Sequence, residues 1–167
     1  MTEKQRIWIV PAAMAATTIV LDQLSKLWIL GALGPEPGAR AVGIVEPWMR
    51  LVYTQNTGVA FSLFRNASNL FIPIALLICA GAVYYYATQL PNRRLPVQLA
   101  LGLVLGGAVG NLIDRVRLGF VVDFVQVGSF PVFNVADSSI TVGTALLLVV
   151  LVFFERHDSP SLETHGA

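Results

Sequence analysis

Long apolar stretches without a charged residue dominate the sequence. Three of them are 17 to 19 residues long, namely Leu70–Ala87, Leu95–Ile113 and Ser138–Phe154. At about 1.5 Å per residue, a helix of that length covers about 25–29 Å, which is close to the thickness of the hydrocarbon core of a bilayer. The pattern therefore predicts three helices that span a membrane.

A fourth apolar stretch, Ile7–Leu33, carries only two charged residues, Asp22 and Lys26. They are four positions apart, so on a helix they share a face and can neutralise each other. Lys4 and Arg6 precede this stretch as in a secretory signal. The apolar pattern nevertheless continues past the small residues at which such a signal would be cut, so we expect a retained span.

We therefore predict an all-α membrane protein with four transmembrane helices and both chain ends on the same side. The expected spans are residues 9–31, 70–88, 95–113 and 137–155 in approximate bounds. Residues 1–157 are expected to form one integral membrane domain. The remainder, 158–167, is polar and contains serine, proline and glycine, which predicts a disordered tail.

Two segments between the spans have a different character. In the first, Trp48–Thr54 is rich in β-branched and aromatic residues, which favours a strand. A turn at 56–58 and the apolar run Val59–Phe64 follow it, so we expect a small β-sheet at the membrane surface over about residues 40–64. The second segment, Asp114–Ala136, is dense in polar residues and does not continue the apolar pattern.

Composition narrows the class of protein further. Hydrophobic residues make up 55% of the chain and charged residues 13%, which is about half the charged share of an average soluble domain. This balance argues against a disordered chain and a nucleic-acid-binding protein. The single cysteine, Cys79, excludes an internal disulfide and a cysteine metal cluster. An integral membrane protein is the class that remains.

Basic residues do not decide the orientation by number. With both chain ends in the cytoplasm, five arginines and lysines would lie inside and five outside. The adjacent Arg93 and Arg94 lie in a very short connection between two spans, which favours the orientation with the ends inside.

Two aspartates in the polar segments have contrasting surroundings. Asp123 is flanked by Val121, Val122 and Phe124, and burial among such residues raises the pKa of a carboxyl group and favours its protonated form. Asp137 stands at the beginning of the fourth span, at the expected N-cap position, where free N–H groups and the helix dipole favour the ionised form. Two such carboxyl groups can share a proton and activate water for attack on an amide.

Simpler interpretations exist for each acidic residue. Asp137 can be a plain helix cap, Asp114 can form an interfacial ion pair with Arg115, and Asp22 with Lys26 can hold helices together. Both histidines, His157 and His165, lie beyond the last apolar run, in the polar C-terminal part of the chain, so a histidine zinc site or a serine triad is not expected. We expect neither a metal nor a cofactor.

Four short motifs occur in order along the chain. They are Asp22-Gln23-Leu24-Ser25-Lys26, then Asn56-Thr57-Gly58-Val59-Ala60-Phe61-Ser62, then Gly107 with Gly110-Asn111-Leu112-Ile113-Asp114-Arg115 and Val121-Val122-Asp123-Phe124, and finally Phe133-Asn134-Val135-Ala136-Asp137-Ser138. Together, on a chain with four spans, these motifs resemble those of the lipoprotein signal peptidase (signal peptidase II) family of bacterial membrane aspartyl peptidases.

The resemblance implies a function and a site. Members of the family remove the signal peptide of prolipoproteins, immediately before a cysteine that carries diacylglycerol. Asp123 and Asp137 correspond to the catalytic aspartates of the family. Positions that support the site or bind substrate would be Asn56, Gly107, Asn111, Arg115, Asn134 and Ala136, whereas Asp22, Lys26 and Asp114 would be structural polar residues.

The resemblance also implies a location and partners. It places the chain in the bacterial inner membrane with both termini in the cytoplasm. The β segment would be a cradle on the extracytoplasmic side, where the active site lies. The expected partners are diacylglyceryl-modified prolipoproteins and membrane lipids, without nucleic acid, and the expected state is a monomer.

Two other functions remain open from the residues themselves. A small proton-coupled transporter could use Asp22, Asp114, Asp123 and Asp137 as carriers, and it would place them near the middle of the spans. A membrane scaffold could be held together by the glycines at positions 102, 106 and 110. Cleavage of a lipidated signal-peptide substrate by the purified protein separates these hypotheses.

Overall fold

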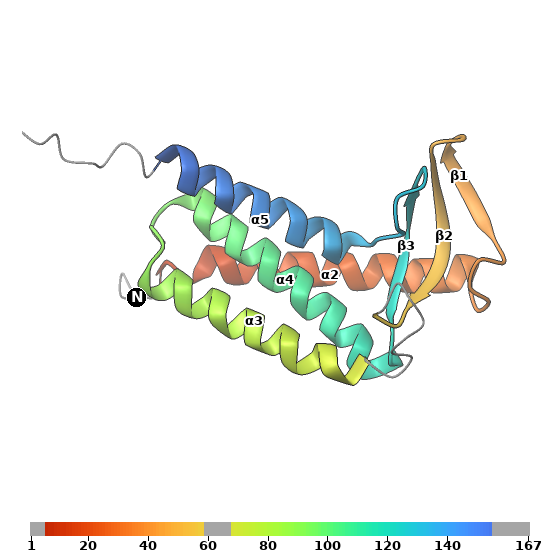
Figure 1. Ribbon diagram of the computed structural model, residues 1–167, viewed down its shortest axis with the longest axis horizontal. Coiled ribbons are helices and arrows are strands. Elements are labelled where there is room, and N and C mark those ends of the chain that lie inside the picture. The colour runs from red at the N-terminus through yellow and green to blue at the C-terminus, as the bar shows by residue number, and fades with distance from the viewer. Residues whose placement is uncertain (1–5, 59–67, 155–167) are drawn as a thin grey trace, which may run out of the picture.

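The computed structural model describes residues 6–58 and 68–154, most of which form four long helices (Figure 1). These are α2 (Ile9–Leu33), α3 (Ser68–Thr88), α4 (Leu95–Leu118) and α5 (Val135–Phe154). Each is long and apolar enough to cross a membrane, which confirms the predicted number of spans among the described residues. Figure 1 shows that α2 and α4 run in one direction and α3 and α5 in the other, so that the chain enters and leaves the bundle at the same end.

Several helix boundaries differ from the sequence-based expectation, and the two next to the polar segment after α4 matter for the site. Helix α4 continues to Leu118, five residues beyond the expected end at 113, and it ends at Gly119, whose φ of 82° is left-handed. The charged residues at this end do not break the helix, because Arg115 and Arg117 lie in its last turn, where the helix dipole favours positive charge. Helix α5 begins at Val135, two residues before the expected start.

A three-stranded antiparallel sheet covers one end of the bundle (Figure 1). Strand β2 (Met49–Asn56) lies in the middle, between β1 (Ala41–Val45) and β3 (Val121–Val127). The predicted surface sheet is therefore confirmed, but its third strand comes from the polar segment after α4, which was not expected to form one. The run Val59–Phe64 lies outside the described residues.

The sheet and the helices share an apolar core at this end. Val122 and Phe124 of β3 and Tyr53 of β2 pack against Ile29 and Leu33, at the C-terminal end of α2. Burial of these residues explains why the short segment after α4 forms a strand, since β3 gains both hydrogen bonds from β2 and an apolar surface from α2. The core thereby holds Asp123, which belongs to β3, against the end of the bundle.

Glycines bring the central helix α4 close to both of its neighbours. A Cβ atom added at Gly102 or Gly106 would stand 2.8 Å from a carbonyl oxygen of α2, and one at Gly110 would stand 2.6 Å from Asp22 Oδ2. On another face of α4, a Cβ atom at Gly107 would meet the carbonyl oxygen of Ala136 in α5. Only glycine permits these approaches, as in other close helix contacts within membranes.

Candidate active site

The two aspartates singled out in the sequence come from the sheet and from a helix. Asp123 belongs to β3 and is only 2% exposed, whereas Asp137 lies in the first turn of α5 and is half-buried. Burial raises the pKa of the Asp123 carboxyl group from 3.8 to about 6, against a hydrogen bond from Asn56 that favours ionisation, and the negative charge of Asp137 adds to the rise. Asp123 is thus suited to hold a proton up to about pH 6.

Asn134 contacts both aspartates. Its Nδ2 donates to Asp123 Oδ1 at 2.7 Å, and its backbone N–H donates to Asp137 Oδ2 at 3.3 Å. Asn134 is fully buried, at 0% exposure, so its amide has no water to bond instead. This residue therefore ties the strand that carries one carboxyl group to the helix that carries the other.

Two further asparagines complete the surroundings of the carboxyl groups. Asn111 of α4 donates from Nδ2 to Asp137 Oδ1 at 2.8 Å, and its Oδ1 accepts from Asn134 Nδ2 at 3.0 Å. Asn56, at the end of β2, donates from Nδ2 to Asp123 Oδ2 at 2.9 Å. Each of the four carboxyl oxygens of the pair therefore accepts an N–H, and the two aspartates are joined through a continuous chain of amides.

The start of α5 corrects one expectation. The N-cap is Asn134, whose Oδ1 accepts from the Asp137 N–H at 2.9 Å while Asp137 Oδ2 accepts from the Asn134 N–H. This reciprocal arrangement is a capping box, and it needs the acidic residue three positions after the cap. The placement of Asp137 at the N-cap itself was wrong, because the helix begins earlier. The side chain of Asp137 still lies among the free N–H groups of the first turn.

A buried ion cluster lies directly behind the aspartate pair. Lys26 Nζ is 2.8 Å from Asp22 Oδ2 and 2.9 Å from Asp114 Oδ2, and all three side chains are at most 4% exposed. The sequence paired Lys26 with Asp22 alone and offered Arg115 as the partner of Asp114. Arg115 instead donates from Nη1 to the carbonyl oxygen of Asn111 at 3.4 Å.

One polar residue of the cluster was not assigned a role from the sequence. Gln23 donates from Nε2 to Asp114 Oδ1 at 3.0 Å, to Asp22 Oδ2 at 3.2 Å and to the Gly110 carbonyl oxygen at 3.2 Å. Its position next to Asp22 within the first motif was the only available signal. Gln23 thereby links α2 to α4 on the outer side of the ion cluster.

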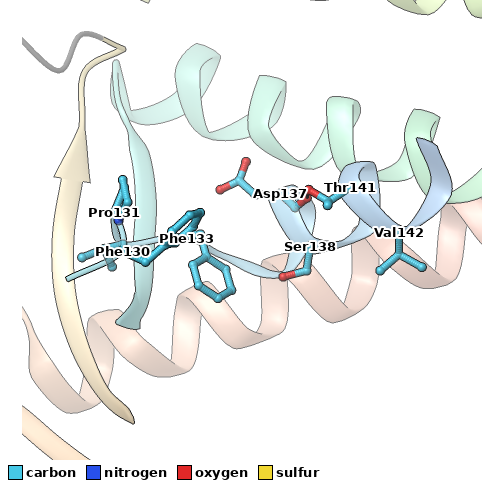
Figure 2. Close-up of a pocket in the computed structure, with 8 residues that line it drawn as sticks. Phe130, Pro131, Phe133, Asp137, Ser138, Thr141 and Val142 are labelled. Carbon is cyan, nitrogen blue, oxygen red and sulfur yellow. Dashed lines mark hydrogen bonds between the residues drawn. The ribbon is translucent and has the colours of Figure 1, made fainter. Parts of the chain in front are cut away.

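A mostly apolar cavity of about 440 Å³ opens beside Asp137 (Figure 2). In Figure 2 the Asp137 carboxyl group projects from α5 toward the sheet, opposite residues of the loop between β3 and α5. The cavity is lined by Phe130, Pro131, Val132, Phe133, Asp137, Ser138, Thr141 and Val142. Such a cavity suits an apolar chain whose backbone passes the carboxyl group, and the sequence did not reveal it, since the lining comes from two separate elements.

The groups around the pair are of types suited to proton transfer. Within residues 6–58 and 68–154, no group of three or more histidines, cysteines, aspartates and glutamates has a metal-binding arrangement. The four oxygens of Asp123 and Asp137 each accept one N–H from an amide side chain or from the backbone. The site can therefore combine an acid, a base and fixed amide dipoles.

Comparison with known proteins gives a consistent result. Residues 14–153 match the family model described as Signal peptidase (SPase) II. The chain is 47% identical over 145 residues to a lipoprotein signal peptidase of Caulobacter vibrioides, covering 82% of this chain and 83% of the relative. It is 42% identical over 139 residues to one of Streptococcus pyogenes, covering 80% and 86%.

Solved structures resemble the fold as well. A bacterial membrane enzyme solved at 2.3 Å by the in meso method superposes with a TM-score of 0.78 at 28% identity, covering 90% of this chain and 92% of that one. A second, solved at 1.9 Å, has the same TM-score at 29% identity, covering 86% and 93%. The motifs, the four-helix fold with its sheet and the relatives agree: the chain belongs to the signal peptidase II family.

Proposed function

We propose that Asp123 and Asp137 are the catalytic dyad with which this peptidase removes signal peptides from prolipoproteins, cutting before the cysteine that carries diacylglycerol. The observation that carries the proposal is the bridge made by Asn134, which donates to both carboxyl groups at once. A buried carboxyl group with a pKa of about 6 and a half-exposed one at the edge of a cavity are thereby held in one network. That is the arrangement an acid and base pair requires.

In this proposal the two residues have different tasks. Asp137 borders the cavity and takes a proton from water, whose oxygen attacks the scissile carbonyl carbon, while Asp123 gives its proton to the carbonyl oxygen. When the tetrahedral intermediate collapses, that proton returns to Asp123 and the C–N bond breaks. The amine of the cysteine takes the proton held by Asp137, so the dyad regains its starting state and one water is consumed.

The neighbouring residues keep the dyad in place. Asn56, Asn111 and Asn134 donate to the ionised forms, and fixed donors of this kind stabilise charge as it develops. Gly107 lets α4 approach the backbone of Ala136, next to Asp137. Arg115 adds a positive charge within electrostatic range of both carboxyl groups.

The surface around the site fits a lipidated substrate. The sheet exposes large apolar residues, among them Ile44, Val45 and Trp48, which is 69% exposed, and such residues favour the membrane interface. Each buried CH₂ group of an acyl chain contributes about 0.8 kcal/mol, so the diacylglyceryl group can hold the cleavage point at this depth. A helical signal peptide must also unwind locally, since its backbone groups are otherwise paired.

We also propose an orientation and an oligomeric state for the protein. The site lies at the sheet end of the bundle, opposite the end where α2 begins and α5 finishes (Figure 1). With both termini in the cytoplasm, the dyad faces the extracytoplasmic side of the bacterial inner membrane. A C-terminal fusion to a reporter enzyme that works only in the cytoplasm should therefore be active. We also propose that the monomer is the active unit, because Asp123, Asp137 and the amides that donate to them need no group from a second chain.

The test uses the purified protein in detergent and a diacylglyceryl-modified prolipoprotein. Wild type should release the signal peptide, and Asp123→Asn and Asp137→Asn should not. Glu36→Gln, an exposed acid-to-amide change away from the site, is the matched control and should cleave normally. Turnover by either dyad variant would remove that residue from the mechanism. Proton flux in liposomes without any cleavage would favour the transporter instead.

The same precursor without its diacylglyceryl group tests the role of the lipid. If the lipid holds the cleavage point, the unmodified precursor should be cleaved much more slowly with the same peptide sequence. Equal rates would leave a general membrane protease rather than one that reads the lipid.

A further inference from the structure

Both carboxylates of the ion cluster behind the dyad accept a hydrogen bond from a backbone N–H group next to a dyad aspartate. The backbone N–H of Ala136 donates to Asp22 Oδ1 at 2.9 Å, and that of Val122 donates to Asp114 Oδ2 at 3.0 Å. Ala136 and Val122 are the residues immediately before the two dyad aspartates. The backbone that leads into each dyad residue is therefore held by one carboxyl group of the cluster.

Lys26 stands between these two carboxyl groups. Its ammonium lies 2.8 Å from Asp22 Oδ2, 2.9 Å from Asp114 Oδ2 and 3.0 Å from Asn111 Oδ1. An ammonium has three N–H donors, so all three are used. The third contact matters for the dyad, because a donor at Asn111 Oδ1 turns Asn111 Nδ2 toward Asp137.

We propose that Lys26 is a positioning residue of this peptidase, which sets the relative placement of the two dyad aspartates through Asp22, Asp114 and Asn111. The proposal rests on the dyad described above and assigns Lys26 a role in the reaction rather than in the fold alone. Lys26 touches neither the substrate nor the reacting atoms. It acts on both aspartates indirectly. Asp22 and Asp114, which it binds, hold the backbone N–H groups of Ala136 and Val122, and Asn111 donates to Asp137.

The energetics of the cluster favour this role over a purely stabilising one. Three charges that are at most 4% exposed lose their hydration, and replacement of a buried ion pair by apolar residues is often neutral or stabilising. Stability alone therefore does not explain why a buried ion cluster of this kind is present. Directional contacts to three acceptors supply an explanation, since they define positions to within a fraction of an ångström, as catalysis demands.

Lys26→Arg separates position from charge. Arginine keeps the positive charge, but its planar guanidinium cannot place three donors where the ammonium has them. We expect a folded protein whose kcat for the lipidated precursor falls on the order of 100-fold, with KM unchanged, because small misplacements of catalytic groups cost rates of this size. The charge-balanced double variant Lys26→Gln/Asp114→Asn should show the same loss, and it serves if the arginine variant does not fold.

Lys26→Gln adds a readout that packing alone would not move. The charged groups around Asp123 are Asp22 and Lys26 from α2, Asp114 and Arg115 from α4, and Asp137 from α5. Loss of the Lys26 charge should move the inflection of kcat/KM that belongs to Asp123 to higher pH, whereas Lys26→Arg should leave it in place.

The matched control is Thr18→Val, a buried polar residue two turns earlier on α2. It can lower the melting temperature but should leave kcat per folded molecule unchanged. A folded Lys26→Arg enzyme with wild-type kcat, KM and pH profile would overturn the proposal. Failure of both the arginine and the double variant to fold would overturn it as well, because Lys26 would then be structural.

The dyad variants are assayed in parallel, so that failure of the dyad assignment can be distinguished from failure of the proposed role of Lys26. If Asp123→Asn or Asp137→Asn still cleaves, the dyad assignment fails. If both are inactive while the Lys26 variants are fully active, only the role of Lys26 fails.

Discussion

The two ends of the helix bundle are buried in different ways. At the end opposite the sheet, the core is apolar and consists of Tyr86, Val97, Leu101 and Val150. At the sheet end, the apolar core of α2, β2 and β3 lies next to a network of buried polar groups, among them Asp22, Lys26, Asn111, Asp114, Asp123 and Asn134. The other end also has hydrogen bonds, from Tyr86 and Gln98 to backbone carbonyl oxygens, but the buried ion cluster and the amide network lie at the sheet end.

The difference shows what each end contributes. An apolar core tolerates a volume-conserving change, because it only has to be filled. A buried polar group that loses its partner costs about 1–3 kcal/mol, so every member of the network at the sheet end depends on the others. The apolar end therefore stabilises the bundle, while the polar end accepts this cost and holds the residues of the proposed chemistry. Substitutions at the two ends should separate stability from activity.

The largest effect is expected for the dyad itself. Asp123→Asn and Asp137→Asn should each lower kcat/KM by about 10³-fold or more, because an amide cannot exchange the proton that the carboxyl group transfers. Both variants should insert into membranes normally, since the amide is nearly isosteric. Cleavage of the lipidated precursor and recovery of purified protein are the measurements, and an active variant would contradict the proposed mechanism.

A pair of core variants compares the two ends directly. Asn134→Ala removes the N-cap of α5 and the bridge between the aspartates, so kcat should fall about 10²-fold by analogy with supporting residues elsewhere. Leu101→Ala at the apolar end should cost about 2–5 kcal/mol of unfolding free energy, with kcat per folded molecule unchanged. Thermal unfolding and cleavage are measured on the same samples. Equal kcat losses in the two variants would abolish the distinction.

Two glycine variants sharpen the same comparison. A methyl group at Gly107 would meet the Ala136 carbonyl oxygen beside the dyad, whereas one at Gly143 would stand 2.8 Å from the Ala100 carbonyl oxygen, toward the apolar end. Gly107→Ala and Gly143→Ala should both lower the melting temperature. Only Gly107→Ala should also reduce kcat, by about tenfold, since it displaces the start of α5. A normal kcat in Gly107→Ala would argue against the tight placement of Asp137.

The pH dependence probes Asp123 with a smaller change. Its pKa is raised from 3.8 to about 6 in the folded protein. Protonated Asp123 therefore contributes to the stability of the fold, fully below pH 3.8, and this contribution is lost as the pH rises through about 6. The dyad needs this proton, and kcat/KM of the free enzyme should therefore decline above about pH 6. Asn56→Ala removes a donor that favours the ionised form and should move the decline to higher pH. A decline that stays in place would assign it to another group.

No effect is expected from chelation. The carboxyl oxygens of the dyad accept amide and backbone N–H groups, which suits activation of water by proton transfer rather than by a metal ion. Activity should survive dialysis against EDTA at the wild-type rate. Loss of activity that a divalent ion restores would require a different mechanism.

The local pattern of apolar and polar residues was sufficient to predict the membrane spans and the candidate site residues. Charge-free runs longer than 16 residues leave few alternatives to a membrane helix, and the apolar neighbours of Asp123 predict its burial without any knowledge of the fold. Local pattern was less informative at boundaries. Asp114 and Arg115 ended the predicted span at 113, yet α4 continues through them, because Asp114 finds its counter-charge in Lys26 of α2.

Sequence alone was enough to predict the four helices, a surface β segment within about residues 40–64 with a strand at Trp48–Thr54, and the residues that carry the proposed chemistry. The tertiary structure alone decided that β3 forms against β2, that Asn134 bridges the two aspartates and that Lys26 connects the backbone before each of them. The reason is distance along the chain. Periodicity and propensity act within a few turns, whereas Lys26 and Asn111 are 85 residues apart and Asp22 and Ala136 are 114 apart, so only the packing of α2, α4 and α5 brings their polar atoms within hydrogen-bonding range.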